Sequence, residues 1–235
     1  MVECRQAVQI PSCATRPDAE CQSLRNRIHE ECLLRVHGPK VHCQQYDAIA
    51  VWWLQQMKDS TYGVAALERA LTFIGSGRHA LDVGCECEGR FLRVLLERGF
   101  DCTRLDISQE MIALAKQRYP AVLFMTGDVC TWSLPRQYDL ITAWDSLFHL
   151  PLEAHEPVLG KLCKGLSLDG VLLFTCGDGK EPGSIQGEFG GKRFEYSSLG
   201  VVEFIRLLHH AGCTIQHLER DQHPLNYVYI VAKKL

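Results

Sequence analysis

The stretch HALDVGCECEGR, residues 79–90, carries the residue types and spacing with the clearest chemical meaning. An apolar run ends at Asp82 and Gly84, and a turn of small and acidic residues then leads to Gly89 and a helical pattern. A strand, a ligand-cradling turn and a helix start form the first unit of a Rossmann-like sheet. Asp82 points from this strand into the turn, where a carboxylate organises loop amides or meets a ligand ammonium.

Two further carboxylates follow predicted strands. Asp106 closes the strand 101–106, and a carboxylate there can accept hydrogen bonds from both ribose hydroxyls of an adenosine-containing cofactor. The alternative role of Asp106 is at the N-terminus of the next helix. Asp128 follows the strand 121–126 and suits an adenine amino group, with a simple turn after Gly127 as the alternative.

The segment YDLITAWDSLFHLP, residues 138–151, is the second informative place. Its strand ends at residue 143, so Trp144 and Asp145 reach the edge of the sheet where ligands bind. His149 lies slightly further on. A histidine near an acid suits general acid or base work near neutral pH, and a packing or hydrogen-bonding role is the alternative.

Alternating strand and helix patterns must position these residues. The last two strands have only a short link between them, so we expect them to pair antiparallel at one edge. The pattern predicts an α/β fold with a Rossmann-like, doubly wound, seven-stranded sheet that is otherwise mostly parallel. The expected strands are 79–83, 101–106, 121–126, 138–143, 170–176, 213–219 and 226–233. The expected helices are a leading helix from Tyr46 and the segments 64–74, 90–98, 108–118, 153–165 and 199–211. A long loop is expected over 177–198.

The chain of 235 residues suits one such domain, over residues 45–235. Residues 1–44 show little sustained periodicity, and we interpret them as a poorly ordered or loosely docked extension. Their five cysteines and three histidines make a metal-binding arm the alternative.

Composition excludes several classes of function. The net charge is −3 and no block of Lys and Arg is present, so no nucleic-acid partner is expected. The apolar runs are too short to span a membrane, and the N-terminus lacks a signal pattern, so we expect a cytoplasmic protein. The spacing of the twelve cysteines predicts reduced, mostly buried thiols and no metal site. The oligomeric state cannot be inferred from the sequence.

Taken together, the motifs DVGCxxxGRF, LDIS followed by a methionine, GDV and FHLP resemble the class I S-adenosylmethionine-dependent methyltransferases. The resemblance covers roughly residues 45–235 and is closest to the small, mostly bacterial methyltransferase-domain group. It implies S-adenosyl-L-methionine as cofactor and methyl transfer to a small-molecule acceptor, with no membrane or nucleic-acid partner.

The resemblance also implies residue roles. The turn from Gly84 through Cys85 and Glu86 to Gly89 would cradle the methionine part of the cofactor. Asp106 would hold the ribose, and the flexible segment 177–198 would form a substrate loop. The implied adenine contacts are Ile107, Met111, Asp128 and Val129. Trp144 would lie near the sulfonium, and Tyr46 would cover the cofactor. His149 or Asp145 would act as a base.

The turn departs from the family pattern, which is close to GxGxGG. Glu86 stands where a glycine backbone normally lies against the cofactor, and Glu88 follows. A carboxylate there attracts an ammonium and a sulfonium but repels a dinucleotide pyrophosphate. A methyltransferase is therefore favoured over a nicotinamide-dependent oxidoreductase. A non-catalytic, cofactor-impaired binding protein on the same fold is the second hypothesis.

Overall fold

The structure is a computed structural model, and it describes residues 39–221 and 227–235. The predicted extension over residues 1–44 thus lies outside the described residues as far as residue 38. Its last six positions, 39–44, belong to helix α2 (Pro39–Gln56). That helix begins seven residues before Tyr46, at a proline, which suits a first helical position.

A seven-stranded sheet forms the centre of the described chain, in the order β3-β2-β1-β4-β5-β9-β8. Neighbours from β3 to β5 run parallel, and β9 runs antiparallel to both β5 and β8. The predicted fold class and the antiparallel terminal pair are confirmed. The strands are β1 (His79–Val83), β2 (Asp101–Asp106), β3 (Leu123–Thr126), β4 (Tyr138–Ala143), β5 (Leu166–Gly177), β8 (Cys213–Asp221) and β9 (Tyr227–Lys234).

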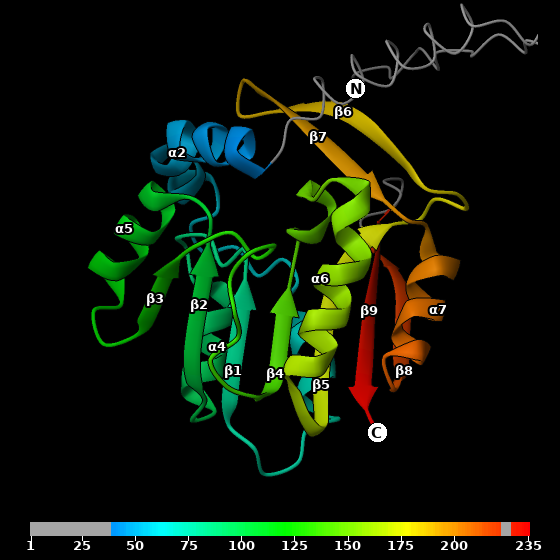
Figure 1. The fold of residues 1–235 in the computed structure, drawn as a ribbon. Helices are drawn as coiled ribbons and strands as arrows, with labels where there is room; N and C mark the ends of the chain where they lie inside the picture. The colour runs from blue at the N-terminus through cyan, green and yellow to red at the C-terminus, as the bar shows by residue number, and fades with distance from the viewer. Residues whose placement is uncertain (1–38, 222–226) are drawn as a thin grey trace, which may run out of the picture. The chain divides into compact units, whose positions relative to one another are not determined.

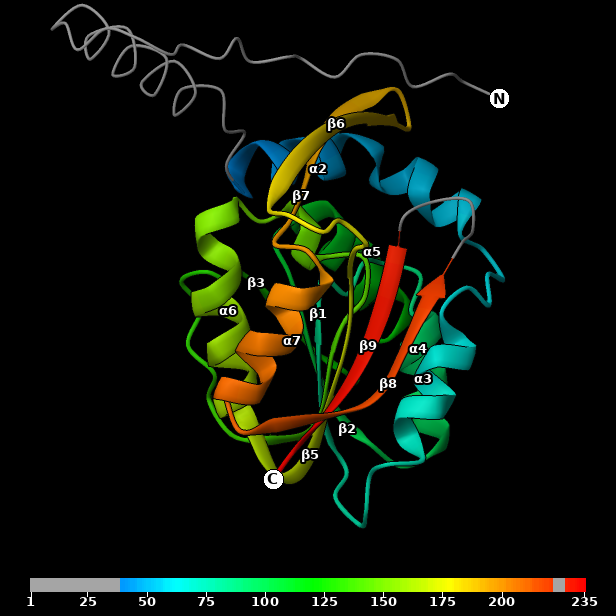
Figure 2. The same cartoon turned by 90° about the vertical axis from the view of Figure 1, so that its right-hand side faces the viewer.

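Helices cover both faces of this sheet, as Figures 1 and 2 show. One apolar core joins one face of the sheet to α3 (Val64–Leu71), α4 (Arg90–Glu97) and α5 (Gln109–Arg118). A second core joins the other face to α6 (Leu152–Gly165) and α7 (Val201–His210). The cover on both faces leaves the central strands almost continuously buried.

The predicted loop over 177–198 is wrong, because most of that segment forms a β-hairpin. Strand β6 (Gly183–Phe189) pairs antiparallel with β7 (Lys192–Ser198). Glycines in β6 hid the strand pattern, although Phe194 in β7 is buried. The hairpin and α2 lie together beyond the carboxyl ends of the parallel strands (Figures 1 and 2).

Polar contacts fasten α2 to the start of α5. The Ser108 side chain accepts a hydrogen bond from the Met111 backbone N–H at 3.1 Å and is the N-cap of α5. The Ser108 hydroxyl in turn donates to Asp47 of α2 at 2.5 Å. The Glu110 backbone N–H also donates to Asp47, at 3.2 Å. Helix α2 is thereby held over the end of β2.

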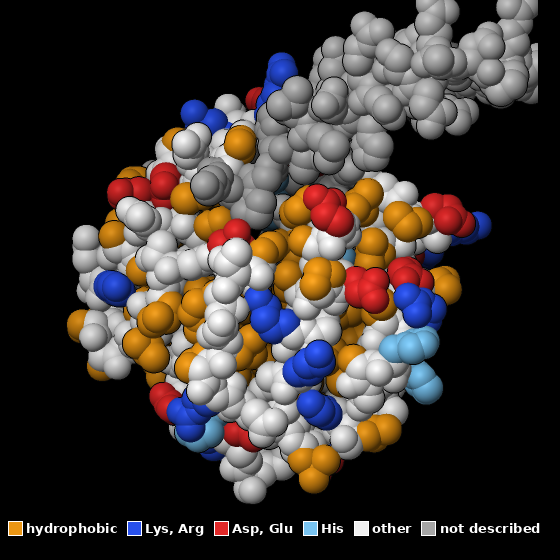
Figure 3. Space-filling view, in the orientation of Figure 1, with side chains coloured by type: hydrophobic (Ala, Val, Ile, Leu, Met, Phe, Trp, Pro, Cys, Tyr) orange, Lys and Arg blue, Asp and Glu red, His pale blue; other side chains and the backbone are white. Residues whose placement is uncertain are grey.

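Within residues 39–221 and 227–235, none of the helices has the length and apolar character needed to cross a bilayer. On the face drawn in Figure 3, basic and acidic side chains are interspersed with apolar ones. All eight cysteines in the described ranges are free thiols.

Candidate functional site

A cavity opens at the carboxyl ends of β1, β2 and β4, beneath α2. Its open space, counting the solvent-open mouth, is about 850 Å³. The structure brings most of the predicted site residues together around it. Those that line the cavity are Tyr46, Gly84, Glu86, Asp106, Ile107, Met111, Asp128, Val129, Trp144, Asp145 and His149.

Asp106 ties the turn after β1 to the end of β2. One of its carboxylate oxygens accepts the Glu86 backbone N–H at 2.9 Å, and the other accepts the Ser108 N–H at 2.9 Å. A carboxylate offers about four acceptor sites, so two remain for hydroxyls of a ligand. Burial raises the pKa of Asp106 to about 6, and the two backbone N–H groups oppose that rise. Its position at the end of β2 suits a ribose contact.

Glu86 occupies the glycine-like position of the turn. Its φ of 48° lies in the left-handed region, which costs a non-glycine residue of the order of 1 kcal/mol or more. Its carboxylate accepts a hydrogen bond from Trp53 Nε1 on α2 and lies 2.5 Å from the Arg90 guanidinium at the start of α4. Burial raises the pKa of Glu86 to about 7, and Arg90 opposes that rise most strongly.

Tyr46 and His149 are in direct contact in the cavity wall. The phenol oxygen lies 2.7 Å from Nε2 of His149, and Nδ1 of the same ring lies 3.4 Å from the Glu195 carbonyl oxygen. Burial lowers the pKa of His149 to about 3, with His42 adding to the effect. The imidazole is thus neutral at pH 7. Nδ1 donates to the carbonyl and Nε2 accepts from the phenol, because a carbonyl can only accept.

Trp144 and Asp145 follow β4 directly, as the sequence predicted. Trp144 is buried against Tyr62, Phe91 and Tyr229. Asp145 has a φ of 49°, and its backbone N–H donates to the Thr175 hydroxyl at 2.8 Å. Burial raises the pKa of the Asp145 carboxyl to about 6. The turn therefore presents an acid at the same edge as His149.

Asp128 makes the turn contacts that the sequence left open and also lies in the cavity lining. One carboxylate oxygen accepts the Cys130 backbone N–H at 2.8 Å, and the Asp128 carbonyl accepts the N–H groups of Thr131 and Trp132. This is the turn role. The residue also lines the cavity beside Val129, so the turn holds the carboxylate at the ligand edge.

Three predicted site residues lie outside the cavity lining. Asp82 is buried and forms an ion pair with Arg104 at 2.7 Å, and it also accepts the Thr142 hydroxyl at 2.6 Å. Cys85 is buried with its carbonyl bound by Arg104. Gly89 has a φ of 81°, and a side chain there would meet the Tyr119 ring. These three residues support the conformation of the turn without lining the cavity.

The lining residues that sequence reasoning missed include His42, Trp53 and Arg90. His42 belonged to the segment assigned to the extension, and Trp53 was read as an ordinary residue of the leading helix. Arg90 was treated as part of the helix start. Its spacing of four residues from Glu86 was the available signal, because residues at that spacing can pair across a turn of helix.

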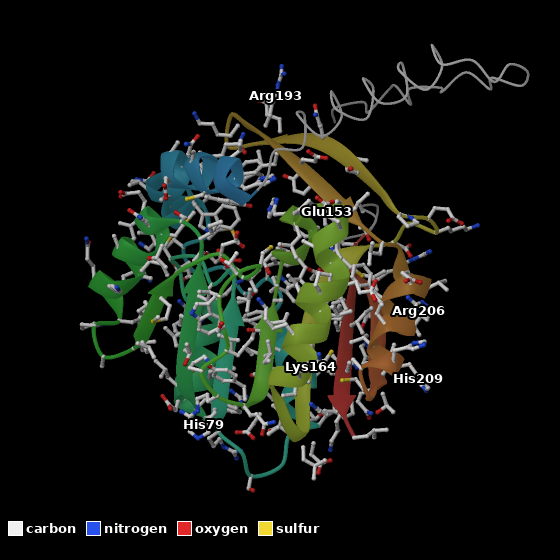
Figure 4. All side chains as sticks on the ribbon, viewed as in Figure 1. His79, Glu153, Lys164, Arg193, Arg206 and His209 are labelled. Atoms are coloured by element: carbon white, nitrogen blue, oxygen red, sulfur yellow. The ribbon has the colours of Figure 1, made fainter. Side chains whose placement is uncertain are left out.

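Several charged residues lie outside the cavity, so they are not candidates for its ligand contacts. Arg193 on β7 is exposed and points away from the sheet, and Lys164, Arg206 and His209 lie on the outer sides of α6 and α7 (Figure 4). In the described ranges, no group of three or more His, Cys, Asp or Glu side chains could hold a metal ion.

Comparisons with known proteins place this site in context. Residues 80–170 match a family described as a methyltransferase domain. The chain is 26% identical over 157 residues to phosphoethanolamine N-methyltransferase of Plasmodium falciparum, covering 63% of this chain and 59% of the relative. It is 33% identical over 111 residues to trans-aconitate 2-methyltransferase of an Acidovorax species, covering 46% and 42%. The chain thus spans about half the length of these relatives.

Solved structures show the same fold. The crystal structure of an S-adenosylmethionine-dependent methyltransferase from Mesorhizobium loti superposes with a TM-score of 0.59. The two are 19% identical, and the match covers 75% of this chain and 99% of the other.

Proposed function

The chain belongs to the class I S-adenosylmethionine-dependent methyltransferases, and on that premise we propose that it methylates a small-molecule acceptor with S-adenosyl-L-methionine as the methyl donor. When bound, this cofactor supplies an electrophilic methyl group on a sulfonium. The remaining work of the protein is to bind, align and exclude water.

The lining of the cavity fits a phosphate-free cation. Its acidic members are Glu86, Asp106, Asp128 and Asp145, and Arg90 is the single Lys or Arg among the described lining residues. Opposite charge favours a ligand that carries a sulfonium and an ammonium. A dinucleotide pyrophosphate would meet the same carboxylates, which supports the methyltransferase over the nicotinamide-dependent oxidoreductase.

Residues at the β2 side suit the adenosine part. Asp106 keeps acceptor capacity for ribose hydroxyls, and Ile107 and Met111 give the purine an apolar wall. Asp128 and Val129 line the same region. Glu86 does not fill the cavity freely, because Trp53 and Arg90 hold its carboxylate. That restraint speaks against the impaired, non-catalytic alternative.

Tyr46 and His149 suit the acceptor end. The neutral imidazole keeps a lone pair on Nε2, and the Tyr46 hydroxyl bridges that lone pair to the cavity. Because burial lowers the pKa of His149 to about 3, the neutral imidazole suits orienting the Tyr46 hydroxyl at the acceptor end rather than taking up a proton. Asp145, whose pKa is raised to about 6, lies at the same edge and is the better candidate for proton acceptance.

The single observation that carries the proposal is that Asp106, Glu86, Tyr46 and His149 line one cavity at the carboxyl ends of the central strands. Calorimetric titration with S-adenosylmethionine, S-adenosylhomocysteine and NAD tests it. We expect micromolar binding of the first two and none of NAD. Absence of binding at millimolar adenosyl ligand would refute the proposal, and tight NAD binding would favour the oxidoreductase.

A further inference from the structure

Asp145 is a carboxylate of the cavity wall that has no cation of its own. It follows β4 directly and lines the cavity. In the described part of the chain, no Lys, Arg or His nitrogen lies within 4.0 Å of its carboxylate, and the Tyr62 hydroxyl donates to it across a long 3.5 Å. Arg90 is already paired with Glu86 at 2.5 Å. Because a carboxylate shielded from water is stabilised by a cation, this end of the cavity favours a cationic ligand group.

A second carboxylate lies near the first. Asp221 ends β8, and its Oδ2 is buried with no hydrogen-bond partner among the described residues. Burial raises the pKa of Asp145 to about 6, and the charge of Asp221 adds to this rise, so the two acids are close enough to interact. Two ionised carboxylates near each other repel, and a cation beside them relieves the repulsion. The pair therefore favours a positive charge on the ligand.

Aromatic rings lie beside the same carboxylate. Tyr196 of the hairpin packs on His149 and Phe148 with ring centroids 5.2 Å and 5.5 Å apart, and Tyr227 of β9 packs on Phe148 at 5.6 Å. Burial raises the pKa of both phenols, and the charge of Asp145 adds to the rise, so both are near that carboxylate and neutral at pH 7. The face of an aromatic ring attracts a cation within about 6 Å, most strongly where water is excluded. Rings and a carboxylate are together the groups that recognise an alkylammonium.

Other acceptor groups fit this end of the cavity less well. A carboxylate or phosphate acceptor would meet Asp145 and Asp221, and Arg90, the single Lys or Arg in the described lining, is held by Glu86. A neutral aromatic acceptor would suit the rings but leave the acids without a cation. An ammonium suits both the rings and the carboxylates.

We propose that the methyl acceptor of this protein is an amine, which enters as an ammonium and lies between the Asp145 carboxylate and the rings of Tyr196 and Tyr227. This inference rests on the proposed function. Before transfer the ammonium gives one proton to Asp145. Its nitrogen then forms a bond to the methyl carbon with the freed lone pair, while the electron pair of the carbon–sulfur bond stays on sulfur. The products are S-adenosylhomocysteine, the N-methylated ammonium and a proton that passes from Asp145 to water.

Three small probes test the recognition of positive charge: choline, the neutral 3,3-dimethylbutan-1-ol and the anionic 3,3-dimethylbutanoate. The first two have the same shape and differ in one atom, the nitrogen or carbon that carries the three methyl groups. Each is titrated by ligand-observed NMR into the protein saturated with S-adenosylhomocysteine, whose own binding is measured first. We expect choline to bind at least about tenfold more tightly than either of the other probes.

Variants of two residues locate the site. Asp145→Asn keeps the shape of the side chain and tolerates the left-handed φ of 49°. It should weaken choline binding by about tenfold, while binding of the alcohol stays within about twofold. Tyr196→Leu should lower the preference for choline over the alcohol by about three- to tenfold, whereas Tyr196→Phe keeps the ring face and the preference. Asp101→Asn removes the same charge at the exposed amino end of β2 and is the control, with no change expected.

The outcomes separate the two proposals. If S-adenosylhomocysteine does not bind, the proposed function fails. If it binds but choline does not, or if choline binds no more tightly than the alcohol, the amine acceptor is refuted while the function stands. Tighter binding of 3,3-dimethylbutanoate would refute it in favour of an anionic acceptor. Should Tyr196→Leu not fold, unchanged choline affinity in Asp145→Asn or a lost preference in Tyr196→Phe would still contradict the assigned groups.

Discussion

The Tyr46 hydroxyl and Nε2 of His149 lie 2.7 Å apart, joining α2 to the short 3₁₀ segment η1 (Leu147–His149) after β4. Tyr46 packs on Phe194 of the hairpin with ring centroids 4.8 Å apart, and His149 packs on the same ring at 5.6 Å. The hydrogen bond therefore lies where helix, hairpin and sheet edge meet, so losing it should affect stability as well as the site.

Tyr46→Phe tests the energetic side of this contact. Removing the hydroxyl leaves a buried Nε2 acceptor without its partner, which should cost about 1–2 kcal/mol of unfolding free energy. Urea denaturation measures the change. Tyr119→Phe is the comparison, because its hydroxyl makes a long, 3.5 Å contact to the Glu88 carbonyl and interacts with Arg93, whose side chain water reaches, and it should cost less. Equal losses in the two variants would contradict the assigned contact.

Gly84 combines a left-handed backbone with a close neighbour at the position of a Cβ. Its φ is +71°, and a Cβ there would lie 2.3 Å from the Ser146 Cβ. Gly84→Ala should destabilise the fold by about 2–4 kcal/mol, from backbone strain and overpacking together. Gly99→Ala isolates the strain, because Gly99 has a φ of +74° and open space around its Cβ. We expect a loss of about 1 kcal/mol there.

Ser146→Gly in the Gly84→Ala background provides the check. Removing the facing side chain should recover the overpacking part of the loss and leave a residual close to that of Gly99→Ala. Chemical denaturation of the three variants would refute the account if the double variant were no more stable than Gly84→Ala alone.

The sheet could be predicted from the sequence because β1, β4 and β5 contain short apolar runs and helical patterns separate the parallel strands. The predicted bounds of β1, β2 and β4 agree with the structure. Burial on both faces produces such runs, and glycine or proline marks their ends. The hairpin β6–β7 escaped prediction because β6 is exposed along most of its length and contains two glycines, which erases the alternation that a half-buried strand shows.

The site was predicted less completely, because contacts between different strands and helices position several of its residues. Asp82 was expected at the ligand, but β1 and β2 pair in parallel with Asp82 directly beside Arg104. The ion pair that results is a consequence of register, which a single strand pattern does not contain. Trp53 and Arg90 reach the cavity only because Glu86 lies between them, a three-part contact that depends on tertiary structure.

The pKa of Glu86 predicts a pH dependence of ligand binding. Burial raises it to about 7, with Arg90, Trp53 and Arg104 opposing and Asp82 adding to the rise. Below a pH of about 7 the Glu86 carboxyl is mostly protonated in the free protein. Ionising it for a ligand then costs binding free energy. A ligand ammonium needs the ionised form. S-adenosylhomocysteine affinity should therefore rise about tenfold between pH 6 and pH 8.

Calorimetry across that pH range with two ligands isolates Glu86. Asp106, with a pKa of about 6, is the proposed ribose ligand, and both ligands share the nucleoside, so the ratio of the affinities for S-adenosylhomocysteine and 5′-methylthioadenosine, which has no amino acid group, should cancel its contribution. The ratio should rise with pH in the unmodified protein and be flat in Glu86→Gln. A pH-independent ratio in the unmodified protein would rule out Glu86 as the titrating partner.

Arg104 supports the turn after β1 without lining the cavity. Replacing it should lower the free energy of unfolding. Its side chain is 2% exposed, and it pairs with the buried Asp82 while binding the Cys85 carbonyl. Arg104→Met leaves the Asp82 carboxylate buried without its cation, which should cost about 3–5 kcal/mol. Arg98→Met removes an exposed pair with Glu68 and should cost less than about 1 kcal/mol.

Because the penalty lies in the uncompensated charge, adding Asp82→Asn to Arg104→Met should restore part of the stability. A double variant less stable than Arg104→Met in urea denaturation would show that packing of the Arg104 chain, rather than its charge, supports the turn.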